Sequence, residues 1–143
     1  GRGPDRDRRA GHRARAGVRG RVRALLPERE AFGRPIGTNQ AVQFMIADMQ
    51  MRAHLSRLAW REAAGRMQRG EPFKQQAAIA KLYTSEAAMD NARTATQVHG
   101  GYGFMIEFPA GRFYRDAKIL EIGEGTSEVQ RMLIARDLGL PGA

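Results

Sequence analysis

The sequence lacks cysteine altogether and has only three histidines among its 143 residues. Without cysteine, neither a disulfide framework nor a thiolate metal site can form. The histidines, His12, His54 and His99, show no metal-ligand spacing. We therefore expect no metal in this protein.

The sequence also lacks any apolar run near the ~20 residues that a membrane-spanning helix needs. The first residues contain no apolar segment of the kind found in secretory signals. We expect a soluble protein with no membrane span, cytoplasmic in a bacterium or in the mitochondrial matrix of a eukaryote. The first residue is Gly1 and not methionine, which suggests a fragment or a processed chain.

The net charge of +9 is concentrated at one end of the chain. Residues 1–27 contain nine arginines and two aspartates, while residues 28–143 contain fifteen basic and thirteen acidic residues. The first segment is also rich in glycine and has little apolar periodicity before Val22. We expect residues 1–27 to be atypical or disordered, and a single domain over 28–143. A shifted reading frame of a GC-rich gene would produce such an Arg-rich and Gly-rich segment, and we treat this as a hypothesis.

From residue 28 onward, apolar residues recur at helical spacing. The pattern predicts a long helix over about 40–67, with Thr38 or Asn39 as its N-cap, and a second helix continuing to about residue 98. A short helical piece is expected over 111–116 and a last helix over 127–138. No stretch alternates convincingly like a strand. The predicted fold class is all-α, an up-and-down helix bundle.

The segment between the last two predicted helices places a carboxylate between two glycines, as Gly123-Glu124-Gly125, just ahead of Thr126 and Ser127. The glycines allow a tight turn and close approach of the backbone to a ligand. Ser127 and Gln130 have the spacing of a capping box, and the free N–H groups of a helix start favour anions. This segment resembles the active-site segment of the acyl-CoA dehydrogenase family.

The resemblance implies that Glu124 is the catalytic base that takes the α-proton of an acyl-CoA thioester. Its own N–H would bind the thioester oxygen, and the β-hydrogen would leave as hydride to the flavin of FAD. Gly125 would lie against the thioester. Gly123 stands where many straight-chain enzymes of the family have tyrosine, which favours branched or bulky acyl groups. The resemblance also assigns flavin contacts to the three residues that follow, Thr126, Ser127 and Glu128.

Two further segments resemble FAD-contacting segments of the same family. In the first, which runs from Glu28 to Gln40, the resemblance implies contacts to an FAD bound mainly by a neighbouring subunit. In the second, a glycine-rich loop follows the second long helix. The implied cofactor-binding residues are Arg29, Phe32 and Gln40 in the first segment and Gln97, Val98, His99, Gly100 and Gly101 in the second.

Together the three motifs imply FAD-dependent dehydrogenation of an acyl-CoA to a trans-2-enoyl-CoA. The chain would be the C-terminal domain of a larger enzyme and inactive by itself. The resemblance further implies an electron-transfer flavoprotein as electron acceptor and a homo-oligomer, either a dimer or a tetramer.

Two other functions stay open at this point. The Arg-rich segment could bind nucleic acid, although the low charge of residues 28–143 and the lack of interleaved aromatic residues weigh against it. A flavin oxidase or monooxygenase could share the scaffold, but the base is commonly altered in such enzymes and Glu124 is retained.

Overall fold

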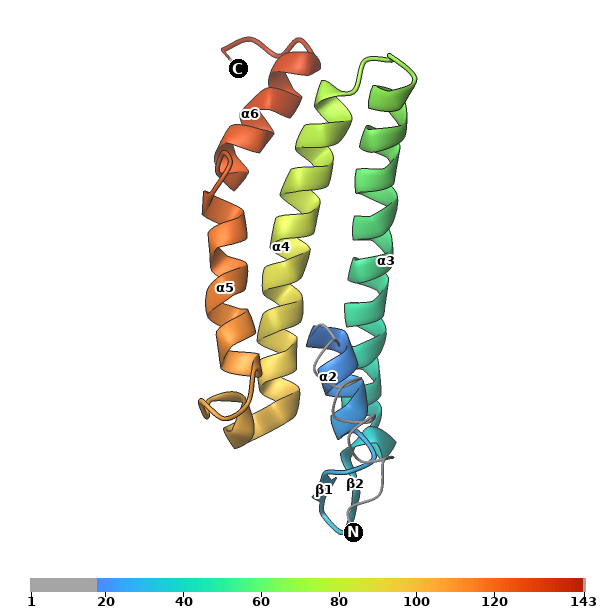
Figure 1. Ribbon diagram of the computed structural model, residues 1–143, viewed down its shortest axis with the longest axis vertical. Coiled ribbons are helices and arrows are strands. Elements are labelled where there is room, and N and C mark those ends of the chain that lie inside the picture. The colour runs from blue at the N-terminus through green and yellow to red at the C-terminus, as the bar shows by residue number, and fades with distance from the viewer. Residues whose placement is uncertain (1–17, 143) are drawn as a thin grey trace, which may run out of the picture.

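The computed structural model describes residues 18–142, and the first seventeen residues of the Arg-rich segment lie outside it. Figure 1 shows two long helices side by side, with two shorter helices stacked end to end along the other side of one of them. The elements are α2 (Val18–Leu25), β1 (Glu30–Ala31), β2 (Arg34–Pro35), η1 (Ile36–Thr38), α3 (Gln40–Gln68), α4 (Lys74–His99), η2 (Gly100–Gly103), α5 (Ala110–Ile122) and α6 (Ser127–Asp137). The all-α fold class predicted from the sequence is confirmed.

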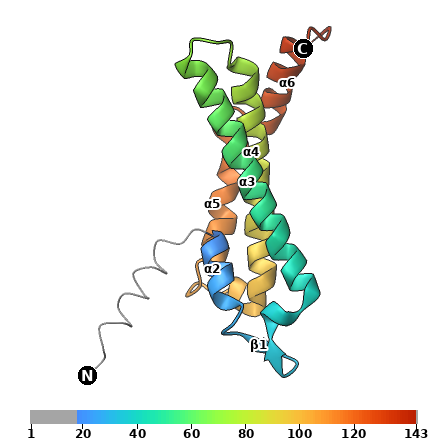
Figure 2. The same cartoon turned by 90° about the vertical axis from the view of Figure 1, so that its right-hand side faces the viewer.

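Helix α3 begins and ends within one residue of the predicted positions, and α4 ends within one residue of its predicted end. The Asn39 side chain caps α3 by accepting a hydrogen bond from the Ala41 N–H at 2.9 Å. The helix ends at Gly70, whose φ of +71° lets the Glu71 N–H reach back to the Arg66 carbonyl. α4 then returns antiparallel to α3, and the two helices cross in the view of Figure 2.

Helix α5 is longer than the sequence predicted, because it spans residues 110–122 instead of 111–116. Its buried positions are Ala110 and Ala117, and Ala117 packs against Met89 and Ala92 of α4. Alanine gives a weak hydrophobic signal in a sequence, since its side chain is a single methyl group. The periodicity that would have marked the full helix is therefore faint.

Helix α6 begins as predicted, and of Thr126 and Ser127, both of which can cap a helix, Thr126 is the N-cap. The Thr126 hydroxyl accepts a hydrogen bond from the Val129 N–H at 3.3 Å. Ser127 is instead the first residue of the helix. At the other end, Gly139 with φ +76° closes α6 as predicted.

Helix α2 lies within the segment that we expected to be atypical or disordered, so that expectation is wrong for residues 18–25. Val22 is 0% exposed and forms a core cluster with Met49, Ala95 and Val98. Leu26 packs against the same cluster. A few apolar side chains on one face are enough to dock a short helix, whatever the average composition of the segment.

A short β-hairpin with two residues in each strand precedes α3. The sequence did not predict it. β1 and β2 pair antiparallel, with Glu30 opposite Pro35 and Ala31 opposite Arg34. The turn residues Phe32 and Gly33 both have positive φ, 55° and 77°, which is the geometry of the tight turns that join hairpin strands. Strands this short carry too few residues for an alternating pattern to be visible in the sequence.

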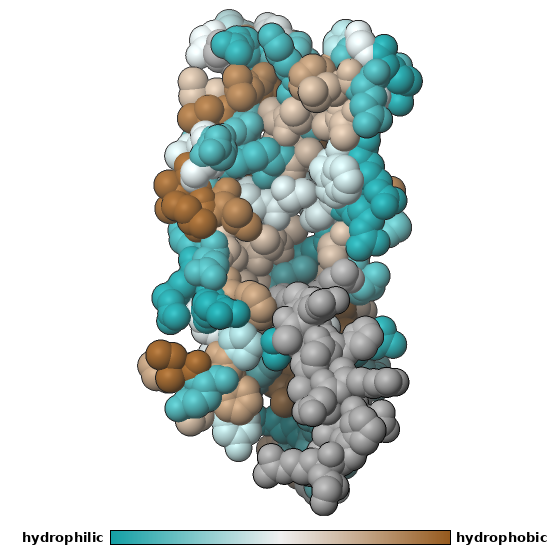
Figure 3. All heavy atoms as spheres, in the orientation of Figure 1, coloured by the Kyte–Doolittle hydropathy of each residue, from teal (hydrophilic) through white to brown (hydrophobic). Residues whose placement is uncertain are grey.

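Apolar side chains remain exposed along α5 and α6. The brown patches on the α5 and α6 side of Figure 3 correspond to this face. The exposed large side chains of the two helices include Tyr114, Ile119, Leu120, Ile122, Val129, Met132 and Leu133. Several exposed apolar patches on one side are typical of a surface that another part of a protein covers.

Gly103 is predicted to tolerate no side chain. A Cβ at this position would lie 2.4 Å from the Thr96 carbonyl oxygen, whereas a Cβ at Gly101 meets nothing within 4 Å. Gly103→Ala should therefore lower the free energy of unfolding by about 1–3 kcal/mol, as overpacking does. Gly101→Ala is the matched control and should leave it nearly unchanged. Chemical denaturation of both variants measures the difference, and equal midpoints would contradict this account of the α4–η2 junction.

Val22→Ala tests whether α2 belongs to the folded domain. Removing two methyl groups from a fully buried site should lower the free energy of unfolding by about 1–3 kcal/mol. Arg23→Ala changes an exposed residue of the same helix and serves as the control. Thermal and chemical denaturation measure the change. If Val22→Ala is as stable as the unchanged chain, the docking of α2 is refuted.

Candidate active site

The turn between α5 and α6 holds Glu124 in an unusual backbone conformation. Glu124 has φ 58°, in the left-handed region that non-glycine residues rarely adopt. Such a residue costs roughly 1–3 kcal/mol and persists only where its surroundings fix it. Gly125 follows with φ 89°, and a Cβ there would lie 2.8 Å from the Gln130 side-chain nitrogen. The positive φ therefore favours glycine at position 125, and its lack of a Cβ lets the Gln130 amide approach closely.

Two side chains hold the carbonyl groups of this turn. Gln130, buried in the first turns of α6, donates from Nε2 to the carbonyl oxygens of Glu124 and Gly125 at 3.4 and 3.3 Å. Lys81 of α4 donates from Nζ to the Gly125 oxygen at 2.5 Å. Hydrogen bonds from α6 and from α4 thus fix the carbonyl groups of the turn.

The N–H side of the turn is open. Within residues 18–142, no acceptor hydrogen-bonds to the backbone N–H of Glu124 or Gly125. The next helix begins two residues later, and the Ser127 hydroxyl is buried there without a hydrogen-bond partner in the described part of the chain. Free N–H groups beside a helix start and an unsatisfied buried hydroxyl suit an anionic or hydrogen-bonding ligand.

Glu128 lies in the first turn of α6, and its pKa is held below the ordinary value of a glutamate. The largest cause is a hydrogen bond from its own backbone N–H, followed by one from the Thr126 hydroxyl. The carboxylate therefore stays ionised to lower pH in the folded chain. Its stabilisation of the helix start is present above the unfolded pKa and is lost as the pH falls through the folded pKa.

Glu124 lies between two clefts and its side chain is exposed. One cleft, of about 470 Å³, is mostly apolar and is lined by residues of α4 and α5 including Ile119, Leu120 and Gly123. The other, of about 590 Å³, lies between α4 and α6 and is lined by residues including Phe73, Lys81 and Leu133. The carboxyl group can thus reach a ligand that enters from either side.

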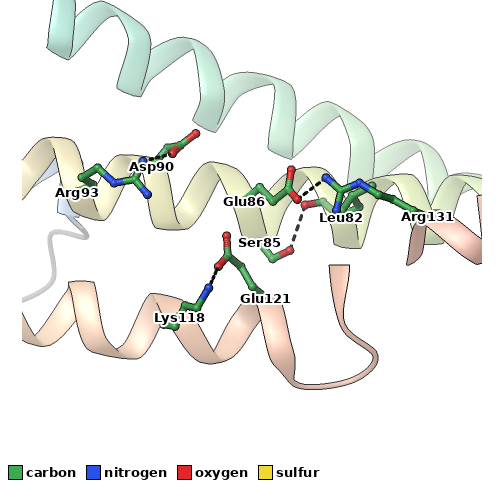
Figure 4. A network of polar contacts seen from close by, with 8 residues as sticks. All are labelled: Leu82, Ser85, Glu86, Asp90, Arg93, Lys118, Glu121 and Arg131. Atoms are coloured by element: carbon green, nitrogen blue, oxygen red, sulfur yellow. Dashed lines mark hydrogen bonds and ion pairs between the residues drawn. The ribbon is translucent and has the colours of Figure 1, made fainter. Parts of the chain in front are cut away.

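Two ion pairs lie on the helices near this turn (Figure 4). Arg131 of α6 pairs with Glu86 of α4 at 2.6 Å, across 45 residues of sequence. Lys118 pairs with Glu121 within α5, also at 2.6 Å. The Arg131–Glu86 pair links α6 to α4, but both side chains are exposed and such pairs contribute little stability.

The other predicted cofactor residues meet at the far end of α4. Arg29 donates from Nη1 to the His99 carbonyl at 2.7 Å, which places a cation at the negative end of the α4 helix dipole. Its guanidinium lies 4.8 Å from the centre of the Tyr102 ring. Gly100 has φ 59°, and a Cβ there would lie 3.2 Å from Arg29 Nη2. Two motifs seventy residues apart therefore form one surface.

The remaining residues of this group differ in accessibility. Phe32 at the hairpin tip is fully exposed, and Gln40, Gln97 and Gly101 are exposed as well. Val98 is 7% exposed and belongs to the core cluster, so its side chain does not contact a ligand.

His99 is the last residue of α4 and not a loop residue as the sequence suggested. Its ring is buried, and Nδ1 lies 2.7 Å from the Ala95 carbonyl oxygen, which accepts the hydrogen bond. Its backbone carbonyl is the group that holds Arg29.

The two groups of predicted residues do not line a common cleft. Lys81, beside the Glu124 turn, and His99, beside Arg29, are eighteen residues apart on α4, which is ~27 Å at 1.5 Å per residue. Sequence reasoning missed Lys81 and Tyr102 entirely and gave Gln130 only a capping role. A lone lysine in an alanine-rich helix carries no local signal, because its partner lies 44 residues away.

No group of three or more potential metal ligands occurs within residues 18–142. Among the helices of that part of the chain, none is long and apolar enough to span a membrane.

A family model described as "Acyl-CoA dehydrogenase, C-terminal domain" matches residues 9–139. The matched range includes residues 9–27 of the Arg-rich segment. The curated protein "Probable acyl-CoA dehydrogenase YngJ" of Bacillus subtilis is 49% identical over 115 residues, covering 80% of this chain and 30% of that protein.

Solved structures of the family superpose closely on this chain. Butyryl-CoA dehydrogenase from Megasphaera elsdenii is 40% identical with a TM-score of 0.83, covering 85% of this chain and 32% of that one. The FAD complex of PigA is 30% identical with a TM-score of 0.84, covering 87% and 33%. The chain thus spans about a third of the length of these relatives. It belongs to the acyl-CoA dehydrogenase family and corresponds to the C-terminal helical domain of its members.

Proposed function

We propose that this domain carries the catalytic base of an FAD-dependent acyl-CoA dehydrogenase, which converts an acyl-CoA thioester to a trans-2-enoyl-CoA. The observation that supports the proposal is the Gly123-Glu124-Gly125 turn. It presents an accessible carboxyl group and, from the same residue, an N–H that has no hydrogen-bond acceptor within residues 18–142.

The reaction needs both groups because the α-proton of a thioester is weakly acidic. As the Glu124 carboxylate takes the proton, negative charge develops on the thioester oxygen. The Glu124 N–H would bind that oxygen, and a donor in such a position is worth roughly 3–4 kcal/mol.

Several residues fit FAD as the cofactor. Near the base, the buried Ser127 hydroxyl lacks a partner within the described residues, and the N–H groups at the α6 start are suited to an anion. Thr126 and Glu128 flank Ser127, although the Thr126 hydroxyl already accepts a hydrogen bond from the Val129 N–H and donates one to Glu128. When bound, the flavin supplies a hydride acceptor for the β-hydrogen of the substrate.

The predicted cofactor residues around Arg29, at the far end of α4, would contact another FAD molecule. That FAD would be held mainly by a neighbouring subunit. A planar guanidinium binds phosphate oxygens well, and among the hydrogen bonds of residues 18–142 Arg29 donates from Nη1 to the His99 carbonyl, which leaves its other N–H groups for a phosphate. Phe32, Gln40, Gln97 and the backbone from Val98 to Gly101 would complete this contact. The Arg29 surface and the Glu124 turn contact α4 at points ~27 Å apart along the helix, which fits two cofactors in a homo-oligomer.

The rest of the enzyme would come from the part of the longer relatives that this chain does not span. That part would cover the apolar face of α5 and α6 and exclude water from Glu124. The isolated domain would then bind FAD weakly and turn over little substrate. We further propose an electron-transfer flavoprotein as acceptor, and a cytoplasmic or mitochondrial matrix location.

Glu124→Gln should abolish most turnover without loss of cofactor. The amide cannot take the α-proton, so kcat should fall about 100- to 10,000-fold. Turnover of acyl-CoA with an artificial electron acceptor measures it, in the longer protein that contains this domain or in a chimera that places residues 28–140 in a relative. FAD content is read from absorbance.

Glu121→Gln is the matched control for this experiment. It neutralises a carboxylate of α5 that pairs with Lys118, close in sequence to the turn, and it should keep normal turnover. Wild-type kcat in Glu124→Gln would end the proposal that Glu124 is the base.

Gly123 should widen the range of acyl groups that the enzyme accepts. It lines the apolar cleft beside Glu124, where a side chain would narrow the space next to the substrate α- and β-carbons. We expect kcat/KM for isobutyryl-CoA or 2-methylbutyryl-CoA to exceed that for butyryl-CoA in the same holoenzyme. A ratio in favour of butyryl-CoA would contradict this role of Gly123.

A further inference from the structure

Lys81 is a charged side chain that the reaction described above does not use. It lies on α4, is half-buried, and lines both clefts that flank Glu124. Within residues 18–142, no carboxylate lies within ion-pair distance of its ammonium group, whereas Lys118, Arg131 and four other cations are paired. Its hydrogen bond goes to the Gly125 carbonyl.

This hydrogen bond is the link between the Glu124 turn and the centre of the bundle. The other hydrogen bonds to residues 123–126 that involve a side chain come from α6 itself. Gln130 donates to the Glu124 and Gly125 carbonyls, and the Val129 N–H donates to the Thr126 hydroxyl. In the described part of the chain, Lys81 is the sole side chain outside α5, α6 and their connection that hydrogen-bonds to the turn.

The turn needs such a link because its backbone conformation is unfavourable for glutamate. With φ at 58°, Glu124 would relax to a commoner conformation if its neighbours allowed it. Relaxation would rotate the peptide groups on either side of Glu124. Both the carboxyl group and the N–H would then leave their present positions.

We propose that Lys81 is a positioning residue, whose ammonium group holds the Gly125 carbonyl and thereby keeps the carboxyl group and N–H of Glu124 aimed together. The role of Lys81 in turnover rests on the proposed function. The effect of Lys81 on the turn conformation does not, so the two can fail separately.

Kinetics of Lys81→Met test the role in turnover. Methionine has similar length and helix propensity but cannot donate a hydrogen bond. In the holoenzyme, kcat should fall about 10- to 100-fold, as a small misplacement of a catalytic group does. KM for acyl-CoA, FAD content and thermal midpoint should change little. Lys81→Arg keeps a charged donor and should recover most of the lost kcat.

Lys118→Met is the matched control, since it removes the same charge from the surface of α5. It should leave kcat unchanged. Normal kcat in Lys81→Met would overturn the proposal. A parallel loss of thermal midpoint and FAD content, not recovered by Lys81→Arg, would show a purely structural role and also overturn it.

NMR of the 143-residue chain tests the turn conformation without any activity. The amide resonances of Gly123 and Gly125 should shift in Lys81→Met and not in Lys118→Met. If the holoenzyme proves inactive on acyl-CoA while these resonances shift, the proposed function fails and the positioning contact stands. If they do not shift, the contact is refuted whatever the enzyme does.

Discussion

The packing of every other described helix against α4 is the constraint on which the structure depends. Helices α2, α3, α5 and α6 all contact it. They can do so because most of the buried apolar residues of α4 are alanines, which let neighbouring backbones approach closely. These alanines are Ala78, Ala80, Ala87, Ala92 and Ala95. A larger residue at any of them would push one neighbour away and shift the turn or loop attached to it.

Because α4 is a rigid rod, it also fixes the distance between the two functional surfaces. Near its start, Lys81 holds the Glu124 turn, and at its end the His99 carbonyl holds Arg29. Neither surface encloses a ligand by itself, since Glu124 and Phe32 are both exposed. In the proposed enzyme, the rest of the protein and a neighbouring subunit would close them, which is why a domain can carry essential groups without being a catalyst alone.

The helices could be predicted where strong local signals agreed. Asn39, Gly70 and Gly139 mark helix ends through their capping or positive φ, and apolar residues between them recur every three to four positions. The prediction failed where the signal was weak. The buried residues of α5 are alanines, which give a weak apolar signal. Helix α2 lies in an Arg-rich segment and buries few side chains. In both cases α4 supplies the stability that the local sequence does not show.

Part of the candidate site could likewise be predicted from the sequence, and part could not. The glycines around Glu124 predicted a tight turn, and the structure adds that Glu124 itself takes positive φ and that Gly125 makes room for Gln130. The roles of the individual residues in binding FAD and substrate stay predictions. Their spatial grouping could not be read from the chain, because Arg29 and His99 meet across seventy residues.

The sequence by itself determined the helical fold class, the order of the long helices and the presence of a Gly-Glu-Gly turn ahead of a helix. These features follow from periodicity, caps and backbone freedom within a few neighbouring residues. Only the tertiary structure decided that Lys81 reaches Gly125, that α2 is part of the core, and that the motifs form two separate surfaces. Each of these depends on contacts between distant residues, and local patterns do not encode them.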